Sequence, residues 1–213
     1  MAAGDDLKLP GLWASLFVTR VKLALSFKGL SFKDVEEDLG NKSELLLSSN
    51  PVHKKVRVLL YNGKPICESV VIVQYTDEAF VGTGPSFLSS DPHECVVARF
   101  WAAYIDDKSF RGKTEEDKSE GINQTFAAVE TLEEALRECS KGEGYFGGDS
   151  VATEVMSGAK IFDPIKTPLL AAWVDCFGEL DCAKAALLDV DRVVEFAKKR
   201  QAQAAAAAAA LEN

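Results

Sequence analysis

The first eighty residues of this chain alternate between two apolar periods, and this alternation limits the possible folds more than any other feature. Residues 7–9 and 31–35 have the two-residue period of strands. Between them, residues 15–28 have the 3.6-residue period of a helix, and Gly29 supplies a stop signal. Strand and helix are therefore predicted to alternate from the beginning of the chain.

The alternation continues to residue 80 and includes a hairpin. A short helix after residue 41 is expected to end near Asn50, because the residue before a proline is disfavoured in helical conformation. The dipeptide Asn62-Gly63, between the apolar run 56–60 and residues 65–67, is typical of a hairpin turn. With a helix over 68–80, the order βαβαββα predicts an α/β thioredoxin-like domain.

After residue 80 the strand period disappears. Residues 81–91 contain glycine, proline and hydroxyl residues without periodicity, which is typical of a linker. Helices are expected over residues 92–108 and 114–140, from Pro168 onward, and from residue 191 into an alanine-rich tail. The predicted domains are a thioredoxin-like domain (1–80), a linker (81–91) and an all-α domain (92–213).

Composition excludes several classes of function. The net charge of -9 argues against nucleic acid as a partner, because phosphate binding needs a basic face. No apolar run reaches the roughly 18 residues of a membrane span, and the N-terminus lacks a signal-peptide pattern, so we expect a cytosolic protein. The five cysteines have neither CxxC nor zinc spacing, and reduced, buried thiols are the simplest interpretation.

Ser15 lies at the predicted junction of the first strand and the first helix. A serine at this position can cap the helix. The same position can also present a hydroxyl and backbone N–H groups to an anion. Two similar alternatives exist elsewhere: Glu68-Ser69 is either a cap or a ligand site, and Lys42, Lys54 and Lys55 are either a solvated basic face or an anion site.

Several of these segments together, in this order and spacing, resemble the tau-class plant glutathione transferases. The resemblance covers residues 7–80 almost without a gap. It includes the segments around Ser15, Asn41-Lys42-Ser43, Asn50-Pro51-Val52-His53-Lys54-Lys55-Val56 and Glu68-Ser69. Later matches are Ala98-Arg99-Phe100-Trp101, Gly112-Lys113-Thr114-Glu115-Glu116 and Lys166-Thr167-Pro168-Leu169-Leu170-Ala171-Ala172-Trp173.

The resemblance implies a role for each site residue. Ser15 would donate a hydrogen bond to the glutathione sulfur and stabilise the thiolate. Lys42 and Lys55 would pair with the glycine carboxylate of glutathione, and Val56 would bind the cysteinyl part through its backbone. The resemblance also implies that Glu68 holds the γ-glutamyl ammonium and that Ser69 binds the adjoining carboxylate.

The resemblance also implies a reaction and an assembly. The glutathione thiolate would attack hydrophobic electrophiles such as herbicides or lipid-derived enals, a detoxification reaction. Phe17 is a candidate for the apolar wall of the substrate pocket. Glutathione would be a cosubstrate, with no metal or tightly bound cofactor. The family implies a homodimer in which the N-terminal half of one subunit contacts the helical half of the other.

This chain departs from the family pattern at three places. Leu16 replaces a proline, and Arg57 replaces a cis-proline directly after Val56. A cis bond before a non-proline residue costs about 2.5–4 kcal/mol, so we expect altered backbone at Val56 and weaker glutathione binding. Relative to the family pattern, sequence is also missing after Lys108 and after Val151, which predicts a truncated, less stable helical half. The alternative function is therefore a catalytically impaired binder of glutathione or apolar ligands.

Overall fold

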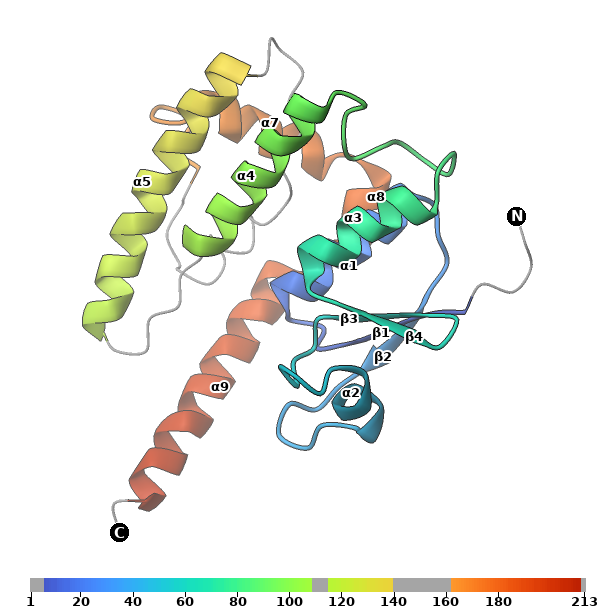
Figure 1. Cartoon of the computed structure of the whole chain (residues 1–213). Coiled ribbons are helices and arrows are strands. Elements are labelled where there is room, and N and C mark those ends of the chain that lie inside the picture. Colours follow the sequence, from blue (N-terminus) through green and yellow to red (C-terminus); the bar gives the residue numbers. More distant parts are fainter. Residues whose placement is uncertain (1–5, 109–114, 140–161, 212–213) are drawn as a thin grey trace. The chain divides into compact units, whose positions relative to one another are not determined.

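The computed structural model describes residues 6–108, 115–139 and 162–211 of the 213-residue chain (Figure 1). The strands are β1 (Leu7–Gly11), β2 (Lys33–Glu36), β3 (Val58–Tyr61) and β4 (Lys64–Cys67). The helices of the described residues are α1 (Leu16–Phe27), α2 (Glu44–Ser49), α3 (Ser69–Ala79), α4 (Pro92–Lys108), α5 (Glu115–Cys139), α7 (Pro168–Gly178), α8 (Asp181–Ala186) and α9 (Val190–Leu211).

The four strands form one mixed sheet in the order β2-β1-β3-β4. β1 pairs parallel with β2 across the α1 crossover, and it pairs antiparallel with β3. Asn62 and Gly63 join β3 to β4 with φ angles of 49° and 76°, and this two-residue turn places Tyr61 opposite Lys64. The predicted βαβαββα order and the hairpin are thereby confirmed.

The sheet has a different cover on each face. On one face α1 and α3 pack against the strands, and on the other lies α2 (Figure 1). Alternate residues of β3 divide between these layers, since Leu59 belongs to the core under α1 and α3 whereas Val58 packs with Leu46 of α2. The side-chain period of two places the strand's apolar residues in both cores. The core under α1 and α3 contains Leu7, Leu9, Val18, Val21, Leu25, Leu59, Ile72 and Phe80.

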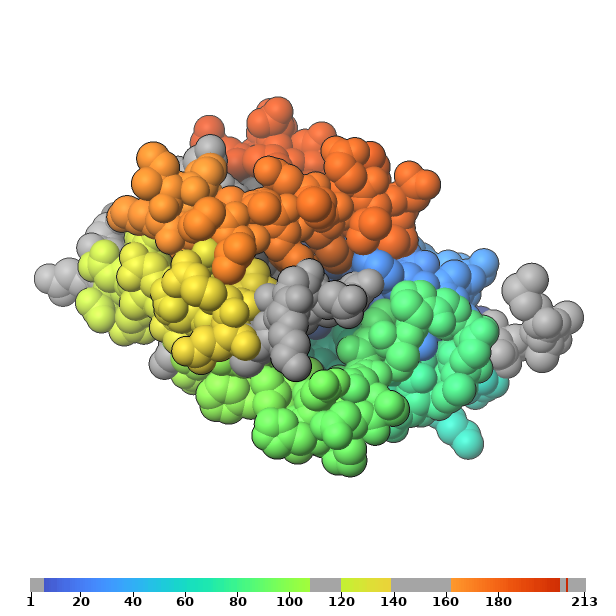
Figure 2. Space-filling model, turned by 90° about the horizontal axis from the view of Figure 1, so that it is seen from above, coloured from blue at the N-terminus to red at the C-terminus, as the bar shows by residue number. Residues whose placement is uncertain are grey.

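The segment between α3 and α4 contains neither helix nor strand, as predicted, and Asp77 of α3 anchors it. The Asp77 carboxylate accepts hydrogen bonds from the backbone N–H groups of Phe87 and Leu88, at 3.0 and 3.1 Å, and from the Ser86 hydroxyl. Lys28 completes the cluster with a buried ion pair of 2.7 Å to Asp77. Much of this segment and of α4 is exposed, and both lie among the green atoms of Figure 2.

The described residues form two compact units. The first contains residues 6–107 and 175–187, so α4 and α8 belong to it, and α8 packs its Ala183 and Ala186 against Leu23 of α1. The second contains residues 115–139, 162–174 and 188–211. Within it, the buried Glu133 of α5 accepts hydrogen bonds from the N–H groups of Leu169 and Leu170, and its carboxylate thereby caps α7.

The structure bears on several expectations from the sequence. The structure confirms four predicted helices: those over 92–108, near 114–140, from Pro168 and through residues 191–200. The six-residue α8 was not predicted. The two places where the chain lacks sequence relative to the family pattern fall largely in residues 109–114 and 140–161, outside the described residues. Cys67, Cys95 and Cys182 are free and only half-buried, and Cys176 is free and exposed, so the expectation of buried thiols is wrong for these four cysteines.

Candidate functional site

Ser15 holds the N-cap position of α1 without capping it. Its backbone is extended, with φ -88° and ψ 121°, and its carbonyl accepts hydrogen bonds from the N–H groups of Val18 and Thr19. The half-buried hydroxyl makes no hydrogen bond to any residue that the structure describes. A side-chain cap is thereby excluded in this structure, and the hydroxyl remains available at the positive end of the helix dipole.

Glu68 and Ser69 begin α3, and neither residue acts as an ordinary cap. Glu68 has a φ of 74°, which is rare for a residue with a side chain, and its carboxylate does not bond to the helix N-terminus. Ser69 is the first helical residue and is only 2% exposed. The capping alternative for this pair therefore fails as well.

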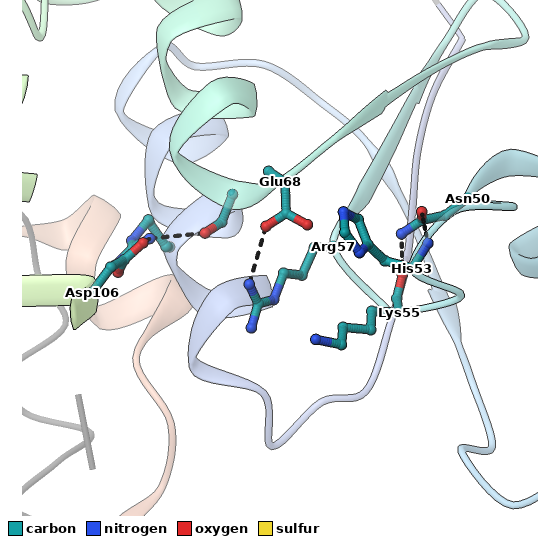
Figure 3. Close-up of polar contacts among 8 residues, drawn as sticks. Asn50, His53, Lys55, Arg57, Glu68 and Asp106 are labelled. Carbon is teal, nitrogen blue, oxygen red and sulfur yellow. Dashed lines mark hydrogen bonds and ion pairs between the residues drawn. The ribbon is translucent and has the colours of Figure 1, made fainter. Parts of the chain in front are cut away.

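Two further residues support Ser69, and sequence reasoning missed both. Arg20 of α1 donates a hydrogen bond of 2.8 Å to the Ser69 hydroxyl. The same guanidinium pairs with both carboxylate oxygens of Asp106 in α4, at 2.6 and 3.2 Å. Such a two-pronged contact fixes the plane of the guanidinium and hence the direction of its bond to Ser69. Figure 3 shows Asp106 beside the end of α3 that begins with Glu68.

The loop before β3 carries Lys54 and Lys55, and a buried asparagine holds it. Asn50 is 1% exposed, its amide nitrogen donates to the Lys55 carbonyl at 3.0 Å, and its amide oxygen accepts from the His53 N–H at 3.1 Å. The Lys42 ammonium donates to the Lys54 carbonyl at 2.9 Å. The Lys42 side chain is thereby held against the backbone of this loop, directly before Lys55, and Figure 3 shows Asn50 bonded to the loop at His53 and Lys55.

The two lysines differ in what their ammonium groups contact. The Lys42 ammonium is bonded to backbone, whereas Lys55 is exposed and no described residue pairs with its ammonium. The backbone position of Lys42 is fixed by its neighbour Ser43. The Ser43 hydroxyl donates a hydrogen bond to the buried Glu37 at 2.5 Å and accepts one from the Leu46 N–H. Both lysines can therefore present positive charge to an anion, Lys55 without giving up a bond.

Val56 and Arg57 occupy the position where the sequence departs from its family pattern. Val56 is 8% exposed and packs with Leu46 and Val58. The peptide bond between Val56 and Arg57 is trans, so the backbone here differs from the cis geometry of the family pattern. Arg57 extends its guanidinium to the Glu68 carboxylate, at 3.0 Å (Figure 3).

Phe17 lies in the first turn of α1, two residues after Ser15. The Arg57 guanidinium carbon is 3.6 Å from the centre of its ring, and that of Arg20 is 5.8 Å away. The ring is therefore in contact with cations as well as half-buried. Nearby, burial and the Glu68 carboxylate both raise the pKa of the Cys67 thiol, which keeps it protonated.

Comparison with known proteins gives consistent results. Residues 6–78 match the family model described as "Glutathione S-transferase, N-terminal domain". "Probable glutathione S-transferase GSTU6" of Oryza sativa subsp. japonica is 46% identical, covering 92% of this chain and 94% of the relative. "Glutathione S-transferase U18" of Arabidopsis thaliana is 39% identical, covering 92% of this chain and 96% of the relative.

Solved structures agree with these relatives. The tau-class glutathione S-transferase of mango, Mangifera indica, has a TM-score of 0.79 at 40% identity, covering 91% of this chain and 97% of that one. Rice GST1 (OsGSTU1), solved in complex with glutathione, has a TM-score of 0.77 at 33% identity, covering 95% and 99%. The alignment with GSTU6 spans 223 positions, more than the 213 residues of this chain, so that relative has residues without a counterpart here.

Proposed function

Because this chain belongs to the tau class of the glutathione S-transferase family, it is a glutathione transferase, and we propose that Ser15 stabilises the thiolate of its bound glutathione. One observation carries the proposal: the Ser15 hydroxyl at the N-terminus of α1 makes no bond to any described residue. A donated O–H and the positive end of a helix both favour a thiolate over a thiol. The thiolate then attacks a hydrophobic electrophile.

The remaining groups bind the two ends of glutathione. Glu68 pairs with the γ-glutamyl ammonium, and Ser69, held by Arg20, donates to the adjoining carboxylate. Lys42 and Lys55 attract the glycine carboxylate from the loop that Asn50 organises. The Val56 backbone binds the cysteinyl part between them. Binding both reactants side by side supplies much of the rate acceleration.

The proposal also covers the electrophilic substrate, the cellular compartment and the oligomeric state. Phe17 contributes one wall of an apolar substrate pocket for xenobiotics such as herbicides. The enzyme acts in the cytosol as a homodimer, with residues 1–80 binding glutathione and residues 92–213 binding the electrophile. None of the described helices is both long and apolar enough to cross a membrane. The alternative, a binder without activity, is not favoured, because the full-length relatives are named as transferases.

The test is the rate of glutathione conjugation to chlorodinitrobenzene. Ser15→Ala should lower kcat/KM at least about tenfold, because a hydrogen bond to a charged group contributes about 1.5–3 kcal/mol. Ser26→Ala, at the other end of the same helix, is the matched control and should retain the wild-type rate. Equal rates for Ser15→Ala and wild type would remove Ser15 from the mechanism.

A second measurement separates the enzyme from the binder. Retention on immobilised glutathione is expected for the wild type and for Ser15→Ala, since the serine acts on the sulfur and the affinity comes from both ends of the tripeptide. A folded wild-type protein that is retained but has no rate above background would instead support the binder.

A further inference from the structure

The hairpin between β3 and β4 determines which residue faces Glu68. Its two-residue turn pairs Tyr61 with Lys64 and Val58 with Cys67. One step beyond this ladder, Arg57 and Glu68 stand opposite each other, and the Glu68 N–H donates to the Arg57 carbonyl at 2.9 Å. Side chains of directly opposite residues lie on the same face of a sheet. The backbone therefore places Arg57 beside Glu68, and the side chains of the two residues meet in an ion pair of 3.0 Å.

Arg57 makes two contacts in this position. Its guanidinium donates to Oε2 of Glu68 at 3.0 Å, and its central carbon lies 3.6 Å from the centre of the Phe17 ring. The side chains of Arg57 and Glu68 are 19% and 38% exposed, so the pair is open to a ligand from solvent. A planar guanidinium suits both contacts, because it stacks on the ring while its edge reaches the carboxylate.

We propose that Arg57 is an affinity- and specificity-determining residue: its guanidinium pairs with the Glu68 carboxylate that would otherwise bind the ammonium of glutathione alone. This inference rests on the proposed function, in which Glu68 receives the γ-glutamyl ammonium. A carboxylate already paired with one cation gains less from a second one, because the two cations also repel each other. The ammonium therefore contributes less to binding in this chain than it would beside an unpaired Glu68.

The proposal concerns the ligand's charge, which distinguishes it from a simple distortion of the backbone. If Arg57 acted only by its trans peptide bond, every glutathione-like ligand would lose affinity equally. If Arg57 competes for Glu68, ligands that keep the ammonium are penalised and ligands that lack it are not. A ligand that lacks the ammonium is the glutathione analogue in which the α-amino group is replaced by hydrogen.

The experiment is a thermodynamic cycle on the full chain, with binding measured by calorimetry. Glutathione and its deaminated analogue are each titrated into wild type and Arg57→Gln. In the wild type the two dissociation constants should be close, and Arg57→Gln should widen their ratio about three- to tenfold by tightening glutathione alone. Arg57→Lys keeps a cation but not the planar stack on Phe17, and it should give an intermediate ratio.

Lys22→Gln is the matched control. Lys22 lies on α1, its side chain is 16% exposed, and it forms an ion pair with the half-exposed Asp34 away from Glu68. Removing it changes the protein's charge by the same amount and should leave the ratio at the wild-type value. An unchanged ratio in Arg57→Gln would overturn the proposal. Failure of glutathione to bind any variant would overturn the proposed function itself, and the inference with it.

Discussion

At the scale of single residues, the expected glutathione ligands differ in how far they are already engaged. The Ser15 hydroxyl and the Lys55 ammonium have no bonded partner among the described residues. Glu68 and Ser69, by contrast, are each held by an arginine, Glu68 by Arg57 and Ser69 by Arg20. In the proposed binding mode, the sulfur and glycine ends of glutathione thus meet groups that are available, whereas its glutamyl end must share groups that already have partners.

Asn50 is the residue on which the position of the basic loop depends most. Asn50→Ala removes a donor and an acceptor that are both used in a buried setting, and it leaves the Lys55 carbonyl and the His53 N–H without their partner. We expect the free energy of unfolding in urea to fall by about 1–3 kcal/mol, and the dissociation constant for glutathione to rise.

The exposed Asn41 offers the control, since Asn41→Ala removes the same amide without breaking a side-chain hydrogen bond. It should change the unfolding free energy by no more than about 0.5 kcal/mol. If both variants unfolded at the same urea concentration, the loop would not depend on the Asn50 amide.

Residue contacts were predictable from the sequence only where a short turn fixes them. The turn at Asn62-Gly63 sets the register of the hairpin, and that register alone would have placed Arg57 opposite Glu68. No comparable signal joins Arg20 to Asp106, which are 86 residues apart. Their contact depends on how α1 and α4 pack, and packing of distant helices is not encoded in local periodicity.

At the scale of elements, the segment after α3 is ordered by one buried carboxylate. Burial alone would raise the pKa of Asp77, but hydrogen bonds from Lys28, Phe87, Leu88 and Ser86 together lower the pKa below its ordinary value. The folded protein therefore binds a proton at Asp77 less readily than the unfolded chain does. By linkage, this stabilisation is complete above the ordinary pKa of about 4 and is lost as the pH falls through the lower folded value.

Asp77→Asn should lower the free energy of unfolding by about 3–5 kcal/mol at neutral pH, because the Lys28 charge stays buried without its counter-ion. The difference from wild type should shrink as the pH is lowered from 6 toward 3, as urea unfolding at each pH will show. Asp34→Asn removes a half-exposed carboxylate and should cost no more than about 1 kcal/mol. A difference that stayed constant with pH would contradict the assignment to the Asp77 charge.

Elements were predicted well where their periodicity was long or their turn chemistry was specific. α1, α3 and α4 match their predicted ranges closely, and Gly29 takes the positive φ of 63° that ends a helix. β1 extends beyond the predicted residue 9, because Pro10 and Gly11 continue the parallel ladder with β2. α8 was missed because six residues show too little periodicity, and its N-cap is Leu180, which has no capping side chain.

At the scale of the whole molecule, the charge of the chain and the charge of the site have opposite signs. The net charge is -9, yet the loop before β3 contains Lys54, Lys55 and Arg57, and the Lys42 ammonium donates to the Lys54 carbonyl. A net negative charge favours solubility, while a local group of cations attracts a small anion. The sequence alone predicts this local group of cations, because Lys54, Lys55 and Arg57 are neighbours in one loop and stay together however the helical half folds.

Exposed apolar side chains on α4 offer a contact surface for the proposed homodimer. Val96 and Phe100 lie one helical turn apart and are 61% and 57% exposed. The Phe100 ring also packs on Trp101 and Tyr104, at centroid distances of 5.1 and 6.5 Å, which holds it in place. Neighbouring apolar side chains on a helix surface, unlike single ones, are typical of an interaction site. We therefore expect a second copy of the chain to cover them.

Sedimentation velocity tests this arrangement. The wild-type chain should sediment as a dimer at micromolar concentration, and the double variant Val96→Asp/Phe100→Asp should sediment as a monomer, because two carboxylates would be buried without partners. Ile165 is 90% exposed, so Ile165→Asp controls for the loss of an exposed apolar group and should remain dimeric. A monomeric wild type would contradict the dimer itself, and a dimeric double variant would place the contact elsewhere on the chain.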